Sequence, residues 1–267
     1  MFLTNQLNKK PNQMKKKQLI VNLLLLLSCS LVISFLTAFQ KNIDFDEQKK
    51  QKRILIFSKT SGYRHESIPF GIAAIKKLGE ENNFLVDATE DSLDINDKKL
   101  KKYKAVIVLS TTGNVLGSIE ETAMQKFIQR GGGFVGIHAA TDCEYNWPWY
   151  VKMVGASFES HPEQQMAKLV IVDSTHTSTK HLPVLWERKD EWYNFKDMNP
   201  AVQVLIKIDE SSYTGGKNGS QHPIAWYHKY DGGKVFYTGL GHTNESYSEP
   251  LFLQHILGGI LYAAGIK

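Results

Sequence analysis

The chain has 267 residues, of which 42% are hydrophobic and 22% are charged, so it is long and apolar enough to bury a sizeable core in one large domain or two small ones. This composition excludes a disordered, collagenous or coiled-coil protein. The two cysteines, Cys29 and Cys143, are too few for a disulfide scaffold or a cysteine-rich zinc module.

The formal net charge of +5 is concentrated near the N-terminus. Residues 1–53 hold ten of the 32 basic residues and three of the 27 acidic ones, which leaves 22 basic and 24 acidic residues in 54–267. A nucleic-acid-binding protein needs a basic patch on its folded part. We therefore expect no nucleic-acid partner.

The N-terminal segment has the pattern of an export signal. Lys15-Lys16-Lys17 precede an apolar stretch from Leu19 to Phe39. Residues 1–39 are predicted to be a signal peptide that is cut near Thr37-Ala38, or a membrane anchor with its lysines inside. A third alternative is lipidation at Cys29, because the residues before it resemble a lipobox. Each alternative places the rest of the chain in the periplasm or on the outer surface, with membrane contact only through this segment.

After a polar linker at residues 40–53, predicted strands and helices alternate. Short apolar runs indicate strands, and helical spacing of apolar residues indicates helices. The predicted strands are 54–57, 84–86, 105–109, 134–137, 169–172, 202–206 and 235–237. The predicted helices are 68–80, 119–128 and a last one that begins at Pro250. Gly131-Gly132-Gly133 stop the second helix and are not a nucleotide-binding loop. The alternation predicts right-handed crossovers and a mainly parallel sheet.

A parallel sheet binds ligands beyond the carboxyl ends of its strands. Gly136-Ile137-His138-Ala139-Ala140 follow such a strand, and small residues around one functional residue are typical of a nucleophile elbow. The lifted residue would be His138, which can exchange protons or bind a metal but is rarely a hydrolytic nucleophile. The alternative is a structural histidine packed at a strand end.

Further candidate groups follow other predicted strand ends or lie close by. His65 and His242 are placed to converge on His138, and His161 could join them. A carboxylate beside a histidine fixes its tautomer or acts as a second acid or base. The predicted catalytic residues are His65, His138, Asp142, Glu191 and His242, while Asp190 is interpreted as a helix or turn cap.

Four of the five tryptophans lie between residues 147 and 192. They either fill a core or form an open platform on which sugar rings pack. In the second case Trp147 and Trp192 are the expected exposed pair. The predicted substrate-binding residues are Arg64, Trp147, His161, Trp192 and Tyr193. The sequence has no tight HxH or HExxH spacing, so we expect no metal or other cofactor, with a histidine-bound zinc as the less favoured alternative.

Four segments, at residues 54–65, 132–142, 190–193 and 239–243, resemble the trehalose-utilisation (ThuA-like) family in the same order. The resemblance runs from about residue 53 to the C-terminus and implies an α/β domain at 54–267. Its implied fold is a flavodoxin-like three-layer sandwich of the class I glutamine amidotransferase type. In such amidotransferases the elbow carries a cysteine, whereas here it carries His138, and Cys143 lies beyond the turn as a predicted small buried residue. His242 with Glu245 approximates the partner pair of that triad, with a spacing one residue longer.

Three functions remain open at this point. The first is an exported enzyme, a hydrolase or an isomerase or lyase, that uses acid/base chemistry on trehalose or a related keto-disaccharide and is not a glutamine amidotransferase. The second is a non-catalytic carbohydrate-binding protein, and the third is a metal-dependent hydrolase. The expected partner is a small-molecule carbohydrate, and the sequence is compatible with a homo-oligomer.

Overall fold

The computed structural model describes Lys16, Leu19 and residues 51–266. The predicted leader and nearly all of the linker lie outside the described residues, so those predictions stay predictions. Among the residues that are described, no helix is both long and apolar enough to cross a membrane. The chain divides into two units, Met1–Gln51 and Lys52–Lys267, and the second contains every element discussed below.

Five parallel strands form one half of a nine-stranded sheet, in the order β2-β1-β3-β4-β11. Their bounds are β1 Lys52–Phe57, β2 Phe84–Thr89, β3 Ala105–Leu109, β4 Gly133–Ile137 and β11 Gly233–Thr238. Every residue of β3 and β4 is buried, as in strands with both faces covered. The predicted α/β class is confirmed, and this half of the sheet is parallel as predicted.

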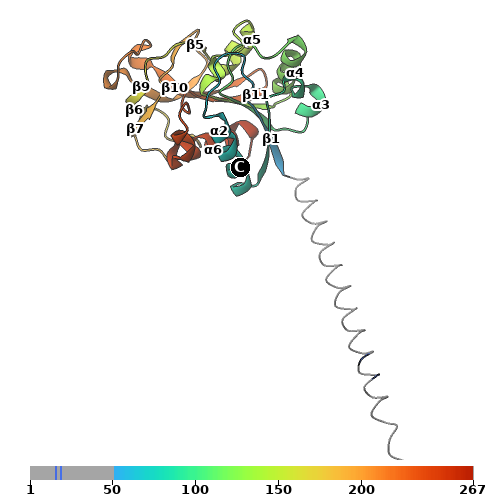
Figure 1. Ribbon diagram of the computed structural model, residues 1–267. Helices are drawn as coiled ribbons and strands as arrows, with labels where there is room; N and C mark the ends of the chain where they lie inside the picture. Colours follow the sequence, from blue (N-terminus) through green and yellow to red (C-terminus); the bar gives the residue numbers. More distant parts are fainter. Residues whose placement is uncertain (1–15, 17–18, 20–50, 267) are drawn as a thin grey trace, which may run out of the picture. The chain divides into compact units, whose positions relative to one another are not determined.

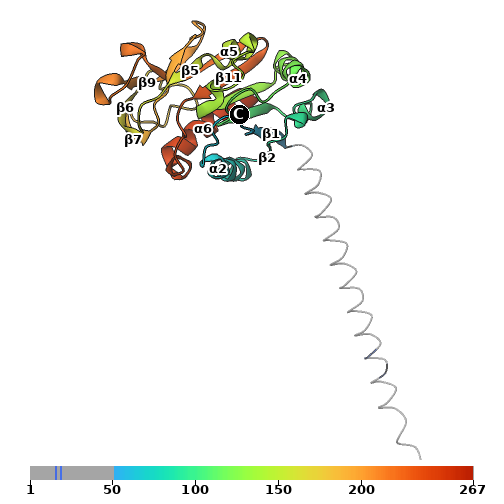
Figure 2. The same ribbon diagram turned by 45° about the horizontal axis from the view of Figure 1, so that its top comes forward.

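Helices cover both faces of the parallel strands and create three layers (Figures 1 and 2). α2 (Ile68–Glu81) and α6 (Pro250–Ala264) lie on one face, and α4 (Ser118–Gln129) and α5 (Pro148–Val154) lie on the other. The short α3 (Asp97–Leu100) packs against α4. Ile119, in the first turn of α4, is 75% exposed, because this helix packs through residues further along it, among them Met124 and Ile128.

The other half of the sheet is antiparallel, which the sequence did not predict. It continues from β11 in the order β10-β9-β6-β7, with β10 at Pro223–Tyr230, β9 at Gln203–Asp209, β6 at Gln165–Ile171 and β7 at Leu185–Asp190. Each of these strands runs antiparallel to the one before it, so β9 and β7 have the same direction as β11. The C-terminal end of β7 therefore lies at the same edge of the sheet as the C-terminal ends of β4 and β11.

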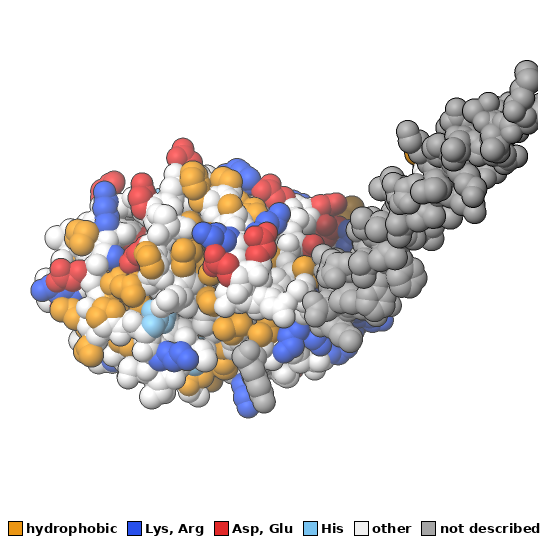
Figure 3. Space-filling view, turned by 90° about the horizontal axis from the view of Figure 1, so that it is seen from below, with side chains coloured by type: hydrophobic (Ala, Val, Ile, Leu, Met, Phe, Trp, Pro, Cys, Tyr) orange, Lys and Arg blue, Asp and Glu red, His pale blue; other side chains and the backbone are white. Residues whose placement is uncertain are grey.

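Small elements complete the domain. β5 (Ser157–Ser160) and β8 (Asn194–Lys196) form a separate two-stranded sheet. Single 3-10 turns are η1 Ser92–Asp94, η2 His138–Thr141, η3 Glu210–Ser212, η4 Gly219–Gln221 and η5 Glu245–Ser248. On the surface shown in Figure 3, basic and acidic side chains are interspersed.

α6 carries a buried histidine whose charge state couples folding to pH. His255 is fully buried, its Nδ1 donates to the carbonyl oxygen of Ser178 over 2.8 Å, and its Nε2 has no partner among the described residues. Burial, only partly offset by the Ser178 hydrogen bond, lowers the pKa of His255 to about 3.

We expect this histidine to contribute to acid lability. The unfolded imidazole titrates near pH 6.5, so stability is complete above that pH and is lost as the pH falls towards about 3, where the folded form also takes up a proton. In His255→Asn the amide can replace the Nδ1 donor but cannot titrate. Between about pH 7.5 and about pH 5, wild type should lose about 2 kcal/mol more unfolding free energy than the variant. Urea denaturation at both pH values measures this, and identical pH dependence in the two proteins would contradict it.

Candidate active site

The tight turn predicted after β4 is present at His138. This residue has a φ of +52°, in the left-handed region that is rare for residues other than glycine, and it is fully buried. Two residues earlier, a Cβ on Gly136 would lie 2.8 Å from Cδ2 of Tyr237 and 3.1 Å from Cβ of Ala140. The small residues around His138 are therefore needed for close packing at the strand end.

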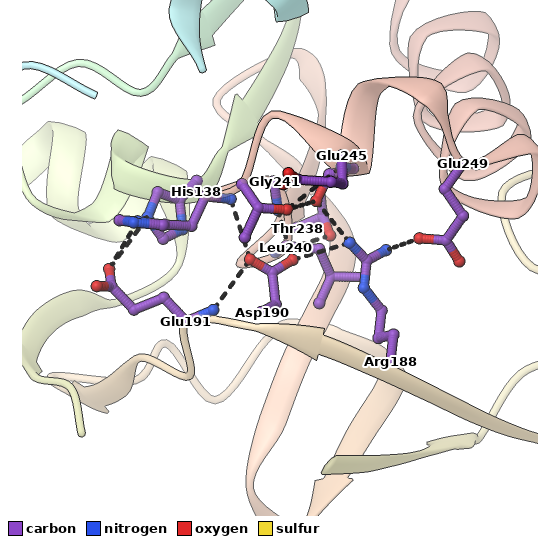
Figure 4. A network of polar contacts seen from close by, with 12 residues as sticks. His138, Arg188, Asp190, Glu191, Thr238, Leu240, Gly241, Glu245 and Glu249 are labelled. Carbon is purple, nitrogen blue, oxygen red and sulfur yellow. Dashed lines mark hydrogen bonds and ion pairs between the residues drawn. The ribbon is translucent and has the colours of Figure 1, made fainter. Parts of the chain in front are cut away.

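Histidines from the loops after three strands meet a carboxylate at the edge of the sheet, and Figure 4 shows two of these groups, His138 and Glu191. The Nε2 atom of His138 lies 3.0 Å from Nδ1 of His242. Oε2 of Glu191 lies 3.3 Å from Nε2 of His138 and 3.1 Å from Nδ1 of His242. The ring of His65 is edge-on to both, with centroids 4.7 Å from His138 and 5.0 Å from His242. The loops after β1, β4, β7 and β11 thus converge as the strand directions require.

The ionisation of this cluster follows from burial and from close neighbours. Burial alone would raise the pKa of Glu191, but the close imidazoles of His138 and His242 outweigh burial and hold the pKa well below its usual range. Burial and then the nearby His138 and His242 lower the pKa of His65 to about 2. Near neutral pH, Glu191 is therefore a carboxylate and His65 a neutral imidazole.

The buried Asp190 carboxylate fixes the position of both loops that carry Glu191 and His242. It accepts hydrogen bonds from the backbone N–H groups of Glu191 at 3.0 Å, Gly241 at 2.9 Å and His242 at 3.1 Å. Nη2 of the buried Arg188 is 3.0 Å from the same carboxylate (Figure 4). Asp190 is thus more than a turn cap, because it joins the end of β7 to the loop after β11.

Other predicted site residues lie at the rim of the cluster or form its wall. Nδ1 of His161 lies 3.2 Å from Oε1 of Glu191, and the His161 side chain is 44% exposed. Tyr193 is buried, with its ring centroid 4.4 Å from that of His138. Asp142 accepts a hydrogen bond from Tyr145, and burial raises the pKa of Asp142 despite this bond. Within the cluster, solvent reaches His161 and the partly buried His242.

The predicted aromatic platform is wrong for Trp192. This side chain is fully buried, and its Nε1 donates to the carbonyl oxygen of Gln165 over 2.9 Å. Trp147 is half-buried and stacks on Trp149 and Tyr150, with centroids 5.0 and 5.8 Å away. These two tryptophans therefore pack against other parts of the domain and do not form an open platform.

Three further residues lie apart from the cluster. Arg64 is exposed and forms an ion pair with Glu90 at 2.7 Å. Glu245 is exposed on η5, and Glu191 contacts His242 in its place. Cys143 is a buried free thiol whose pKa is raised by burial, as expected for a small core residue. The structure thus offers no ionised cysteine within its described part that could replace an elbow nucleophile.

The sequence missed Arg188 and the anchoring role of Asp190. Buried and exposed residues alternate strictly along β7, with Trp186, Arg188 and Asp190 on the buried face. The sequence Leu185–Asp190 itself has no alternation of apolar and polar residues, so it carried no period-two signal for this strand. An arginine and an aspartate on one buried face must be paired, but only the structure shows that these two share that face.

Comparisons with known proteins agree with this architecture. The ThuA family model, described as trehalose utilisation, matches residues 53–263. A ThuA-like protein from Bacteroides uniformis is 26% identical, with a TM-score of 0.68 over 80% of this chain and 92% of that chain. One from Parabacteroides merdae is 20% identical, with a TM-score of 0.68 over 81% of this chain and 91% of that one. A β-galactosidase from Bacillus circulans shares the fold at 14% identity and a TM-score of 0.54, over 81% of this chain and 31% of that one. A comparison with curated proteins gives no match.

Replacing the Asp190 carboxylate should destabilise the domain strongly. In Asp190→Asn the side chain keeps its size, but an NH₂ group must face backbone N–H groups or Arg188, and the buried guanidinium loses a negative partner. We expect unfolding free energy to fall by about 3 to 5 kcal/mol in chemical denaturation. Glu90→Gln, which breaks the exposed pair with Arg64, is the control and should cost less than about 1 kcal/mol. Equal small effects of the two substitutions would show that Asp190 is not the anchor.

Proposed function

The chain belongs to the ThuA family, which is associated with trehalose utilisation, and on that premise we propose that its domain binds and transforms a carbohydrate at the histidine cluster. The substrate class is trehalose or a related keto-disaccharide. The reaction class is acid/base chemistry, either hydrolysis or an isomerase- or lyase-type proton transfer.

The observation that carries the proposal is the contact of His138, His242 and Glu191 at the ligand-binding edge of the sheet. Acid/base catalysis on a sugar needs groups that can hold and release a proton within hydrogen-bond reach of each other. His242 touches both other groups and is partly open to solvent, so it is placed to exchange a proton with the substrate. The buried His138 and Glu191 orient His242 through these two contacts.

The rim supplies a second group for the reaction. His161 is bound to the same glutamate and is exposed, and Asp142 has a pKa raised by burial. Either group can serve as the partner acid or base to His242. Glutamine amidotransfer is not proposed, because the one described cysteine is buried and un-ionised.

A second candidate is a non-catalytic carbohydrate-binding protein. The complete burial of His138 favours it, since a histidine that substrate cannot touch can be purely structural. This candidate predicts sugar binding without turnover.

We also propose that the domain acts outside the cytoplasm. The support is the lysine-flanked apolar stretch in residues 1–39, which resembles an export signal or anchor. The domain itself then meets its carbohydrate in the periplasm or at the outer surface.

Turnover of a panel of disaccharides and their 3-keto forms tests the catalytic proposal. His138→Ala and His242→Ala should each lower kcat/KM by at least about 100-fold, because each removes a group that holds or moves the proton. His181→Gln is the control, because His181 is not a member of the cluster and an amide can keep its hydrogen bond to the carbonyl oxygen of Leu251. Unchanged turnover in His138→Ala would contradict the proposal.

Calorimetry separates the two candidates. Sugar binding by wild type that persists in His138→Ala, with no turnover of any ligand, would establish the binding protein instead of the enzyme.

A further inference from the structure

The donor atoms at the centre of the cluster are spaced like the ligands of one metal ion. One atom from each of His65, His138, Glu191 and His242 lies within 4.8 Å of the other three. The edges of the triangle formed by Nε2 of His138, Nδ1 of His242 and Oε2 of Glu191 are 3.0, 3.1 and 3.3 Å. Ligands bound tetrahedrally at about 2.0–2.1 Å are roughly 3.3 Å apart, so these three atoms are already at coordination spacing.

Hydrogen bonds alone cannot satisfy these three contacts. Nδ1 of His138 lies 3.0 Å from the carbonyl oxygen of Gly239, which can only accept, so Nδ1 carries the proton. In neutral His138 the lone pair of Nε2 then faces the carboxylate oxygen of Glu191 as well as His242. Two acceptors at 3.3 Å repel each other unless a proton or a metal ion lies between them.

The same hydrogen bond is the usual support of a metal-binding histidine. Such histidines donate their other ring N–H to a backbone carbonyl or a carboxylate, which fixes the tautomer and the ring orientation. Gly239 provides that carbonyl to His138, and the positive φ of His138 aims its ring at the cluster. Asp190 in turn fixes the backbone of both Glu191 and His242.

His65 supplies the fourth donor. Its side chain is 3% exposed, and its Nδ1 has no hydrogen-bond partner among the residues that the structure describes. One ring nitrogen of His65 lies within the set of four donor atoms, and a buried imidazole that is short of hydrogen bonds is costly to keep there without a ligand.

We propose that His65, His138, His242 and Glu191 bind one divalent transition-metal ion of the zinc type. Three imidazoles and a carboxylate suit zinc, cobalt, nickel or iron better than magnesium or calcium, which prefer all-oxygen sites. Any catalytic role of this ion rests on the proposed function. In that role the ion would act as a Lewis acid that polarises a bound water or a sugar oxygen. Binding of the ion itself does not depend on the identity of the substrate.

Metal titration of the purified full-length protein tests this site. After chelator treatment and dialysis, Zn²⁺ binding is measured by calorimetry and elemental analysis, and Co²⁺ is added separately to record the visible absorption of four-coordinate cobalt. We expect one ion per chain, a raised melting temperature on metal addition, and at least about 100-fold weaker binding in His138→Ala and Glu191→Gln. His181→Gln, outside the cluster, should bind like wild type.

The variants are compared as folded proteins, using circular dichroism of the metal-free forms. Substoichiometric binding in wild type, or equal affinity in wild type, His138→Ala and Glu191→Gln, would overturn the metal site. Sugar turnover is assayed in parallel with and without chelator. Stoichiometric metal without sugar turnover would refute only the proposed function, whereas turnover by a metal-free protein that binds no metal would refute only the metal site.

Discussion

The candidate site depends on one buried carboxylate that ties together two loops distant in sequence. Asp190 ends β7, and it binds the backbone N–H groups of Glu191, Gly241 and His242 while it pairs with Arg188. Burying the two charges of Asp190 and Arg188 carries a desolvation cost that only close pairing and several hydrogen bonds offset. Because the site is held through backbone atoms, the side chains of Glu191 and His242 remain free to face His138.

The parallel half of the fold and most of the cluster could be predicted from the sequence. Continuous apolar runs mark β1, β3 and β4, and the carboxyl ends of parallel strands share one edge, so His65, His138 and His242 could be expected to meet. The antiparallel half could not be predicted, because strand direction there is decided by long-range pairing and not by local pattern. The exposure of the tryptophans could not be predicted either, because the sequence pattern does not distinguish a ring buried in the core from one on an open sugar-binding surface. Trp192 is buried.

The fold places an imidazole, and neither a thiol nor a hydroxyl, at the tight turn after β4. The turn after β4 raises His138 in a left-handed conformation, as an elbow does, but the residue is an imidazole whose Nδ1 is occupied by Gly239. Its remaining nitrogen faces another imidazole and a carboxylate that is ionised near neutral pH. Such an arrangement suits proton transfer or cation binding and does not suit acyl transfer, which accords with a family associated with sugar use.

The orientation of the His138 lone pair is the central claim, since both the proton-transfer role and the metal site require it. Long-range ¹H–¹⁵N NMR of histidine-labelled, metal-free protein reads the tautomer of this ring directly. Our account predicts a protonated Nδ1 and an unprotonated Nε2, with the Nε2 resonance shifting when Zn²⁺ is added. A protonated Nε2 on a neutral ring, unaffected by Zn²⁺, would contradict it.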